Sequence, residues 1–367
     1  MTRSVNDLLE VIQKSDLKKS NNLFQKNIEL GIDAWEIHNS LFPVAQQVLN
    51  PPYINPHLPK MYRIYRELVQ YLENDDIPSL VNLEICEYTR RKKLKIPPKI
   101  VLTSSPVSFT DIQTAIDNND LEKTAALLYQ LSISGDIRTV ARKLLLIGSG
   151  YLDDSLGHSV SCTAFILLEM IERKDQELWP ALITLSNYFC KGNFTTNPKL
   201  KLQKVSENKT DAMLQAVSGL GIVNLHHTIT RYAIERVRTL LTPEEFAHMI
   251  NSWIDFMGEK QTEPITLKRK PMKTVDKYSQ FYDIFSRLEV EPTVECLAGM
   301  LTTSTGRQRI GRFLIKGLCD LYQGDYDPHY LTGLGSVLWV INSYWHEGSI
   351  VTSAVYQYLD YFFKHLI

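Results

Sequence analysis

Apolar side chains recur every three to four residues along most of the chain, with polar side chains between them. Within residues 61–72, Met61, Ile64, Leu68 and Leu72 form one apolar stripe, which is the spacing of a helix that buries one face. No long stretch alternates apolar and polar residues as a half-buried strand does. The pattern therefore predicts an all-α protein, a bundle of many helices.

The same spacing predicts where most of the helices lie. Pro43 is expected to kink or split one of them, because proline removes a helix hydrogen bond. Thr242-Pro243-Glu244-Glu245 is typical of a helix start, with Thr242 as the cap. The predicted helices cover residues 4–14, 33–49, 61–72, 79–94, 110–118, 120–131, 136–147, 177–190, 212–224, 226–241, 242–257, 278–288, 293–301, 306–322, 328–345 and 350–366, and one more begins at His158.

Proline and serine interrupt the helical pattern once in the first third of the chain. Pro97-Pro98 and then Ser104-Ser105-Pro106 favour extended backbone. We predict a linker at residues 96–108, which separates a smaller N-terminal helical unit (1–95) from a main helical domain (109–367).

Charge and cysteine content exclude several classes of protein. The chain has 40 Lys and Arg against 41 Asp and Glu, so no overall field attracts nucleic acid or an anionic membrane. Its five cysteines lie far apart and form no C-x-x-C pair, which argues against a disulfide framework and a structural zinc site. We expect reduced and mostly buried thiols.

The N-terminal residues do not read as a signal peptide, since residues 4–14 are amphipathic rather than continuously apolar. The most apolar stretch, residues 331–344, is shorter than a bilayer crossing and contains Gly333, Gly335 and Asn342. A buried helix fits it better than a membrane span. The sequence thus predicts a soluble, cytoplasmic protein that binds neither nucleic acid nor membrane.

Three histidines stand at the heads of apolar segments. Asp327-Pro328-His329 begins the most apolar one, with Asp327 as a cap and Pro328 at the first helical position. His158 and His227 begin two others, and each of the three histidines is followed three residues later by Ser or Thr. The repetition predicts that His158, His227 and His329 line one interior pocket in the main domain.

Imidazoles from three helices suggest a metal site. We predict His158, His227 and His329 as catalytic residues and metal ligands, with Glu169 and Glu235 as carboxylate ligands or hydrogen-bond acceptors. The expected cofactor is a transition metal such as Fe, and an open coordination position would permit oxygen or hydrolytic chemistry. Without a metal, the same imidazoles would act as general bases in a desolvated pocket.

The segments 156–164 (LGHSVSCTA) and 225–233 (LHHTITRYA) resemble the histidine-headed helices of questin-oxidase-like proteins and of helical regions that accompany some Rieske proteins. The resemblance covers the predicted main domain. It implies an oxygenase-like oxidoreductase that acts on a small organic substrate, with His158, His227 and His329 lining the pocket. The chain lacks the cysteine and histidine pairs of a Rieske cluster, so no iron–sulfur role is expected.

A structural interpretation competes with the enzyme. Buried histidines commonly bond to a neighbouring hydroxyl or carbonyl, and the aromatic residues Tyr356, Tyr358 and Tyr361 of the last helix are typical of a core or a subunit interface. The protein would then be a non-catalytic helical interaction or scaffold protein whose last helix makes a homodimer contact. Three histidines in one cavity would favour the enzyme, and three separate buried positions would favour the scaffold.

Overall fold

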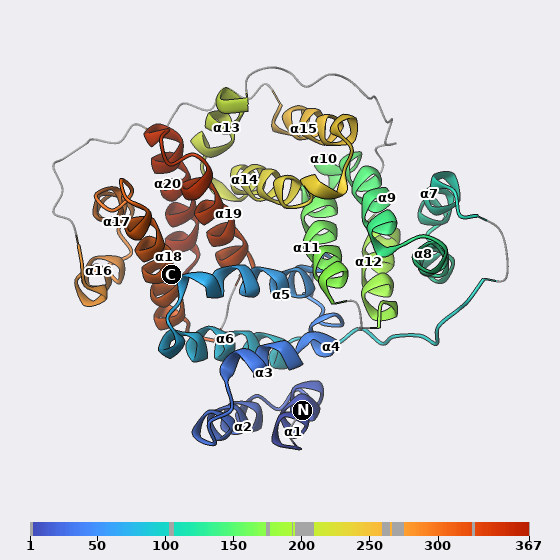
Figure 1. Ribbon diagram of the computed structural model, residues 1–367, viewed down its shortest axis with the longest axis horizontal. Coiled ribbons are helices and arrows are strands. Elements are labelled where there is room, and N and C mark those ends of the chain that lie inside the picture. The colour runs from blue at the N-terminus through green and yellow to red at the C-terminus, as the bar shows by residue number, and fades with distance from the viewer. Residues whose placement is uncertain are drawn as a thin grey trace. The chain divides into compact units, whose positions relative to one another are not determined.

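The computed structural model describes residues 3–102, 106–173, 177–192, 194, 209–258, 265, 275–324 and 327–366. Within these ranges the chain forms twenty α-helices and three short 3-10 turns (Figure 1). No strand occurs among the residues so described, which contain two isolated β-bridges, Val48 with Lys93 and Asn50 with Tyr53. The all-α fold predicted from the apolar spacing is confirmed.

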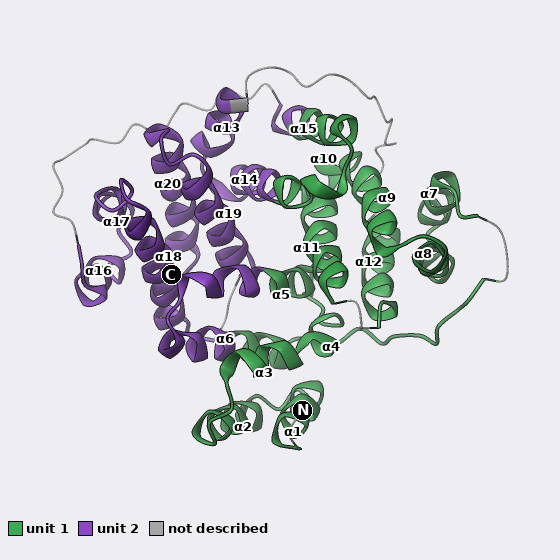
Figure 2. Ribbon diagram, viewed as in Figure 1, with its two compact units in different colours: residues 1–63, 84–205, 233–253 green, residues 64–83, 206–232, 254–367 purple. Residues whose placement is uncertain are grey.

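The helices divide into two compact units, which Figure 2 colours separately. Unit 1 comprises residues 1–63, 84–205 and 233–253, and unit 2 comprises residues 64–83, 206–232 and 254–367. The division falls within four helices, namely α5 (His57–Leu68), α6 (Ile77–Arg90), α14 (Gly221–Arg236) and α15 (Pro243–Met257).

Ten further helices belong wholly to unit 1. Among them α9 packs against α11, α8 packs against α12, and α1 packs against α2. The ten are α1 (Arg3–Gln13), α2 (Leu17–Glu29), α3 (Ala34–Ser40), α4 (Phe42–Ala45), α7 (Phe109–Asp117), α8 (Leu121–Ser134), α9 (Ile137–Ser149), α10 (Leu152–Ser155), α11 (His158–Glu172) and α12 (Trp179–Lys191).

Most helices of unit 1 lie where the apolar spacing predicts them, and α2 is the main exception. Its buried positions are Ser20, Phe24 and Asn27, so the face that packs inward is largely polar and gives little periodic signal. Asp16 caps this helix by accepting from the Lys19 N–H at 3.0 Å. Pro43 splits the predicted helix 33–49 into α3 and α4, as its missing N–H requires.

The segment predicted as a linker packs onto unit 1. The indole N–H of Trp179 donates to the carbonyl of Pro97 at 2.8 Å. Ile96 and Ile100 pack against a small cluster that contains Ala125 and Ile183. Extended backbone is present here, as the prolines suggest, yet its apolar side chains are partly buried, and residues 84–205 all belong to unit 1.

Six helices belong wholly to unit 2. Within this unit α20 packs against α13, α17 and α19, and α18 packs against α19. The six are α13 (Lys209–Ser218), α16 (Tyr278–Phe285), α17 (Val290–Ala298), α18 (Ser304–Leu321), α19 (His329–Ser343) and α20 (Gly348–Leu366).

The apolar run that begins after Asp327 forms α19, one of the most buried helices of unit 2. A Cβ built on Gly333 would lie 3.1 Å from the ring of Tyr358, so the small residue sets how closely α19 approaches α20. Four of the aromatic side chains of α20 are buried as well, with Tyr358 and Tyr361 at 1% and 3% exposure, whereas Tyr356 is partly exposed. Among the described residues, no helix combines the length and the apolar character needed to cross a bilayer.

Candidate functional site

A sharp reversal of the chain places His158 at the start of α11. Leu156 and Gly157 both adopt the left-handed conformation, with φ of 49° and 76°, so α10 ends abruptly and the next helix begins at His158. Glycine takes this conformation at no steric cost, which explains its place before the histidine. His158 is buried, and its Nδ1 lies 2.6 Å from the carbonyl oxygen of Ser155.

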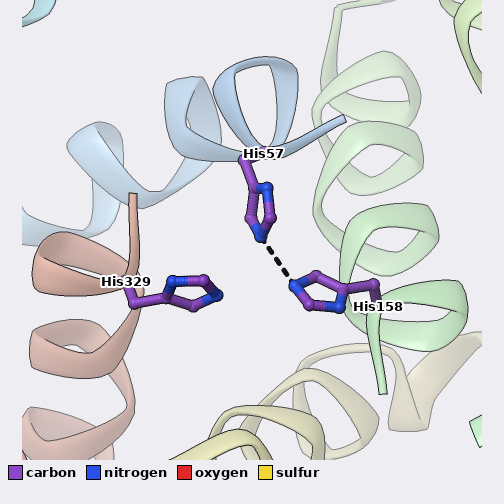
Figure 3. Close-up of side chains that lie close together, drawn as sticks. All are labelled: His57, His158 and His329. Atoms are coloured by element: carbon purple, nitrogen blue, oxygen red, sulfur yellow. Dashed lines mark hydrogen bonds between the residues drawn. The ribbon is translucent and has the colours of Figure 1, made fainter. Parts of the chain in front are cut away.

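His57 faces His158 within unit 1. It is the first residue of α5 and is 2% exposed, and its Nε2 lies 2.6 Å from Nε2 of His158 (Figure 3). The two rings meet edge to face, with planes at 89°. Since the Ser155 carbonyl only accepts, Nδ1 of His158 carries a hydrogen and its Nε2 accepts from His57. This pair is therefore satisfied as two neutral imidazoles.

A second pair of histidines lies within unit 2. His329, the first residue of α19, places its Nε2 3.0 Å from Nε2 of His226 on α14. Nδ1 of His226 lies 2.8 Å from the carbonyl oxygen of Ile222, one helical turn earlier. Nδ1 of His329 lies 2.5 Å from Oδ1 of Asp327. Both rings are thus anchored through Nδ1, and their Nε2 atoms face each other.

Asp327 is held ionised by its hydrogen bonds. Its Oδ1 also accepts from the backbone N–H of His329 at 2.9 Å, which is the capping contact that the sequence suggests, and its Oδ2 accepts from the Tyr361 hydroxyl at 2.5 Å. Burial alone would raise the pKa of this carboxyl, but the hydrogen bonds from His329 and Tyr361, together with the charge of His329, lower the pKa well below its usual range.

The hydrogen bonds of His226 and His329 favour a cation between their Nε2 atoms. Each Nδ1 lies beside an oxygen that only accepts, so each Nδ1 carries a hydrogen. Because a neutral imidazole has one N–H, two neutral rings would oppose two lone pairs across 3.0 Å. A third proton or a metal cation removes that repulsion. Two nitrogens bound to one metal at about 2.1 Å and at a right angle are about 3.0 Å apart.

The other residues predicted for the site make different contacts. His227 is buried, and its ring meets Phe256 edge to face at 4.8 Å. Glu169 is buried between two guanidinium groups, with Oε1 2.5 Å from Arg173 and Oε2 3.4 Å from Arg63. These ion pairs compensate its charge, which is the usual requirement for a buried carboxylate.

Glu235 forms a partly exposed ion pair with Arg238, three residues further along the chain, at 3.3 Å. Such a pair contributes little to stability. The ligand roles of His227, Glu169 and Glu235 stay predictions, and His226 competes with His227 as the ligand on α14.

Sequence reasoning gave no weight to His57 and left His226 aside in favour of its neighbour. A signal for His57 is present in the chain, because Asn55-Pro56-His57 repeats the order of Asp327-Pro328-His329 and also begins a helix. No comparable signal separates His226 from His227, since adjacent helical residues point about 100° apart and the rotation of α14 is set by its packing.

Comparison with known proteins gave no relatives. A scan against family models, a search of curated proteins and a search of solved structures each found no match.

Proposed function

We propose that this protein is a metal-dependent enzyme that binds a transition metal through its paired histidines and oxidises a small organic substrate. The observation that carries the proposal is the approach of His226 and His329. Their Nε2 atoms lie 3.0 Å apart while both Nδ1 atoms already donate to oxygens, so the two facing lone pairs suit a shared cation.

The contacts around the second pair favour a metal over a bare proton. Histidine ligands of metals usually donate their other ring N–H to a carboxylate or a backbone carbonyl, which fixes the ring and makes the free nitrogen a better ligand. His329 donates to Asp327, and His226 donates to Ile222. Tyr361 in turn holds Asp327. Both nitrogens are thus presented as neutral donors.

The donor set indicates the class of metal. Imidazole nitrogens suit Fe, Cu, Zn and Ni, whereas Mg and Ca prefer oxygen ligands. Within each unit the paired histidines supply such nitrogens, from His57 and His158 in unit 1 and from His226 and His329 in unit 2. We propose iron first, because the resemblance of the helices beginning at His158 and before His227 to questin-oxidase-like proteins implies oxidative chemistry. A metal with an open coordination position supplies Lewis acidity or activates a small ligand.

The scaffold alternative loses part of its support in unit 2. It used the Tyr-rich last helix as a dimer contact, but Tyr358, Tyr361, Phe362 and Phe363 are all at most 3% exposed. Tyr361 is also committed to Asp327. A dimer contact through this helix would rest on Tyr356, which is partly exposed. The buried histidine pairs are therefore the stronger indication of function.

Elemental analysis tests the proposal when the protein is purified without a metal-affinity step. The expected result is near-stoichiometric iron, or full loading after anaerobic addition of Fe(II), with loss of metal in His329→Ala. Nitric oxide added to the Fe(II) form then probes for an open position, through the EPR signal of a ferrous nitrosyl.

His346→Ala is the matched control, because this side chain is 59% exposed and pairs only loosely with Glu347 at 3.8 Å. A folded wild-type protein that binds neither iron nor another transition metal would refute the metal-dependent function. A protein that binds metal, gives no nitrosyl signal and consumes no oxygen with any reductant would refute the oxidative role alone.

A further inference from the structure

The side chain of Asn50 connects His57 to an arginine. Asn50 lies between α4 and α5 and is 5% exposed. Its Oδ1 accepts from Nη1 of Arg91 at 3.0 Å, and its Nδ2 lies 3.2 Å from Nδ1 of His57. Arg91 also donates through Nη2 to the buried carboxylate of Glu87 at 3.0 Å. This second hydrogen bond fixes the orientation of the guanidinium group. All of these residues belong to unit 1.

The donors and acceptors in this chain determine where the His57 proton sits. A guanidinium only donates, so the Asn50 oxygen must face Arg91 and the amide NH2 must face His57. Nδ1 of His57 therefore accepts, and in the neutral ring the hydrogen is on Nε2. That hydrogen is donated to Nε2 of His158.

The resulting hydrogen bonds all run in one direction. Arg91 donates to Asn50, Asn50 donates to His57, His57 donates to His158, and His158 donates to the carbonyl of Ser155. Successive bonds of the same direction polarise and strengthen one another in a buried environment. The contacts of Asn50 and those of His158 therefore place the His57 hydrogen on the same nitrogen, Nε2.

We propose that Asn50 and Arg91 are positioning residues that keep the imidazole hydrogen of His57 on Nε2. In that form His57 cannot bind a metal through Nε2, because the nitrogen carries a hydrogen instead of a free lone pair. His57 becomes a ligand only when its hydrogen moves to Nδ1 and Asn50 turns its amide to accept it. This turn breaks the bond between Arg91 and Asn50. The ligand role of His57 rests on the proposed function, whereas the tautomer does not.

Asn50→Asp tests this arrangement because it keeps the size of the side chain and replaces the NH2 group with an acceptor. One oxygen of the introduced carboxylate can still accept from Arg91 while the other accepts from Nδ1–H of His57. The expected result is a hydrogen on Nδ1 of His57 in metal-free Asn50→Asp and none on that nitrogen in the wild type, read from the ring 15N shifts by NMR. About pH 8.5 suits the measurement, since histidine is then mostly neutral.

Metal affinity gives the second reading of the same variant. We expect Asn50→Asp to bind Fe(II) or Zn(II) roughly 10–100-fold more tightly than the wild type, as a carboxylate acceptor does for a metal-bound histidine. A residue with a merely structural role would lower the affinity or leave it unchanged. Arg91→Met, which frees Asn50 to turn, should raise the affinity by a smaller factor.

Arg90→Met is the control, because Arg90 is exposed and has the same charge one residue away. The inference is overturned if wild-type His57 carries its hydrogen on Nδ1, or if Nδ1 of His57 carries no hydrogen in Asn50→Asp. Failure of the proposed function would look different. The wild type and Asn50→Asp would then both bind no metal, while the NMR comparison would still show the added hydrogen on Nδ1.

Discussion

Nε2 of His226 lies 3.0 Å from Nε2 of His329, and the other nitrogen of each ring already donates to an oxygen. This relationship is the basis for the proposed metal site. It also separates His226 from its neighbour His227, whose ring lies against Phe256. We therefore expect His226→Ala to lose bound metal and His227→Ala to retain it. Elemental analysis of both folded variants checks this, and equal metal content in the two would show that the assignment of His226 is wrong.

Asp327 controls His329 through two hydrogen bonds, from the ring Nδ1 and from the backbone N–H. In Asp327→Asn the amide oxygen accepts more weakly and carries no charge. We expect metal affinity to fall about 10–100-fold, measured by competition with a chromophoric chelator. Asp283→Asn is the control, because Asp283 is exposed and lies outside these contacts. Unchanged affinity in Asp327→Asn would remove Asp327 from the site.

Gly148 fixes the crossing of α9 and α11. A Cβ at this position would lie 2.7 Å from the backbone oxygen of Ser159, and the Ser159 hydroxyl donates to the Gly148 carbonyl at 2.7 Å. Gly148→Ala should therefore push α11 away and cost about 1–3 kcal/mol of unfolding free energy, as overpacking does. Gly348→Ala, with no atom within 4 Å of the added Cβ, should cost nothing measurable. The midpoints of urea unfolding of the two variants test this difference. Equal midpoints would contradict the close packing of Gly148 against Ser159.

Lys93 gives the stability of the protein a dependence on pH. Burial lowers the pKa of its ammonium from 10.5 to about 8, although it donates to Ser15 and Thr89. Between these two values the unfolded chain binds more protons than the folded one, so the contribution of Lys93 to stability increases as pH rises. Urea unfolding at pH 8 and at pH 10.5 should show this increase in the wild type and less of it in Lys93→Met.

Lys92→Met is the matched control for that comparison, because Lys92 is exposed. It should keep the pH dependence of the wild type. If Lys93→Met and Lys92→Met change equally between the two pH values, the buried ammonium is not the cause.

Local spacing was enough to predict the fold class and most of the helices. The apolar stripes of α1, α5 and α8, and the cap at Thr242, follow from contacts within three to four residues. Thr242 accepts from the Glu245 N–H at 3.3 Å, and Glu245 accepts from the Thr242 N–H at 2.9 Å, as a capping box requires. Helix α2 was not predicted, because its inward face carries the polar residues Ser20 and Asn27.

The candidate site was harder to predict, because its partners are distant in sequence. His158 and His329 were found from their place at helix starts. Their partners, His57 and His226, lie 101 and 103 residues away in the sequence, so each pairing depends on how distant helices pack. Asn50 shows the limit most clearly. Nothing in its local sequence indicates that its amide lies between Arg91 and His57.

The most direct test of the account is the number of transition-metal ions per chain, measured on wild type and on His226→Ala and His329→Ala. The account predicts a transition-metal ion held by His226 and His329 within unit 2, and both folded variants should lose it. No metal in the wild type, or full metal content in both His226→Ala and His329→Ala, would contradict the central claim.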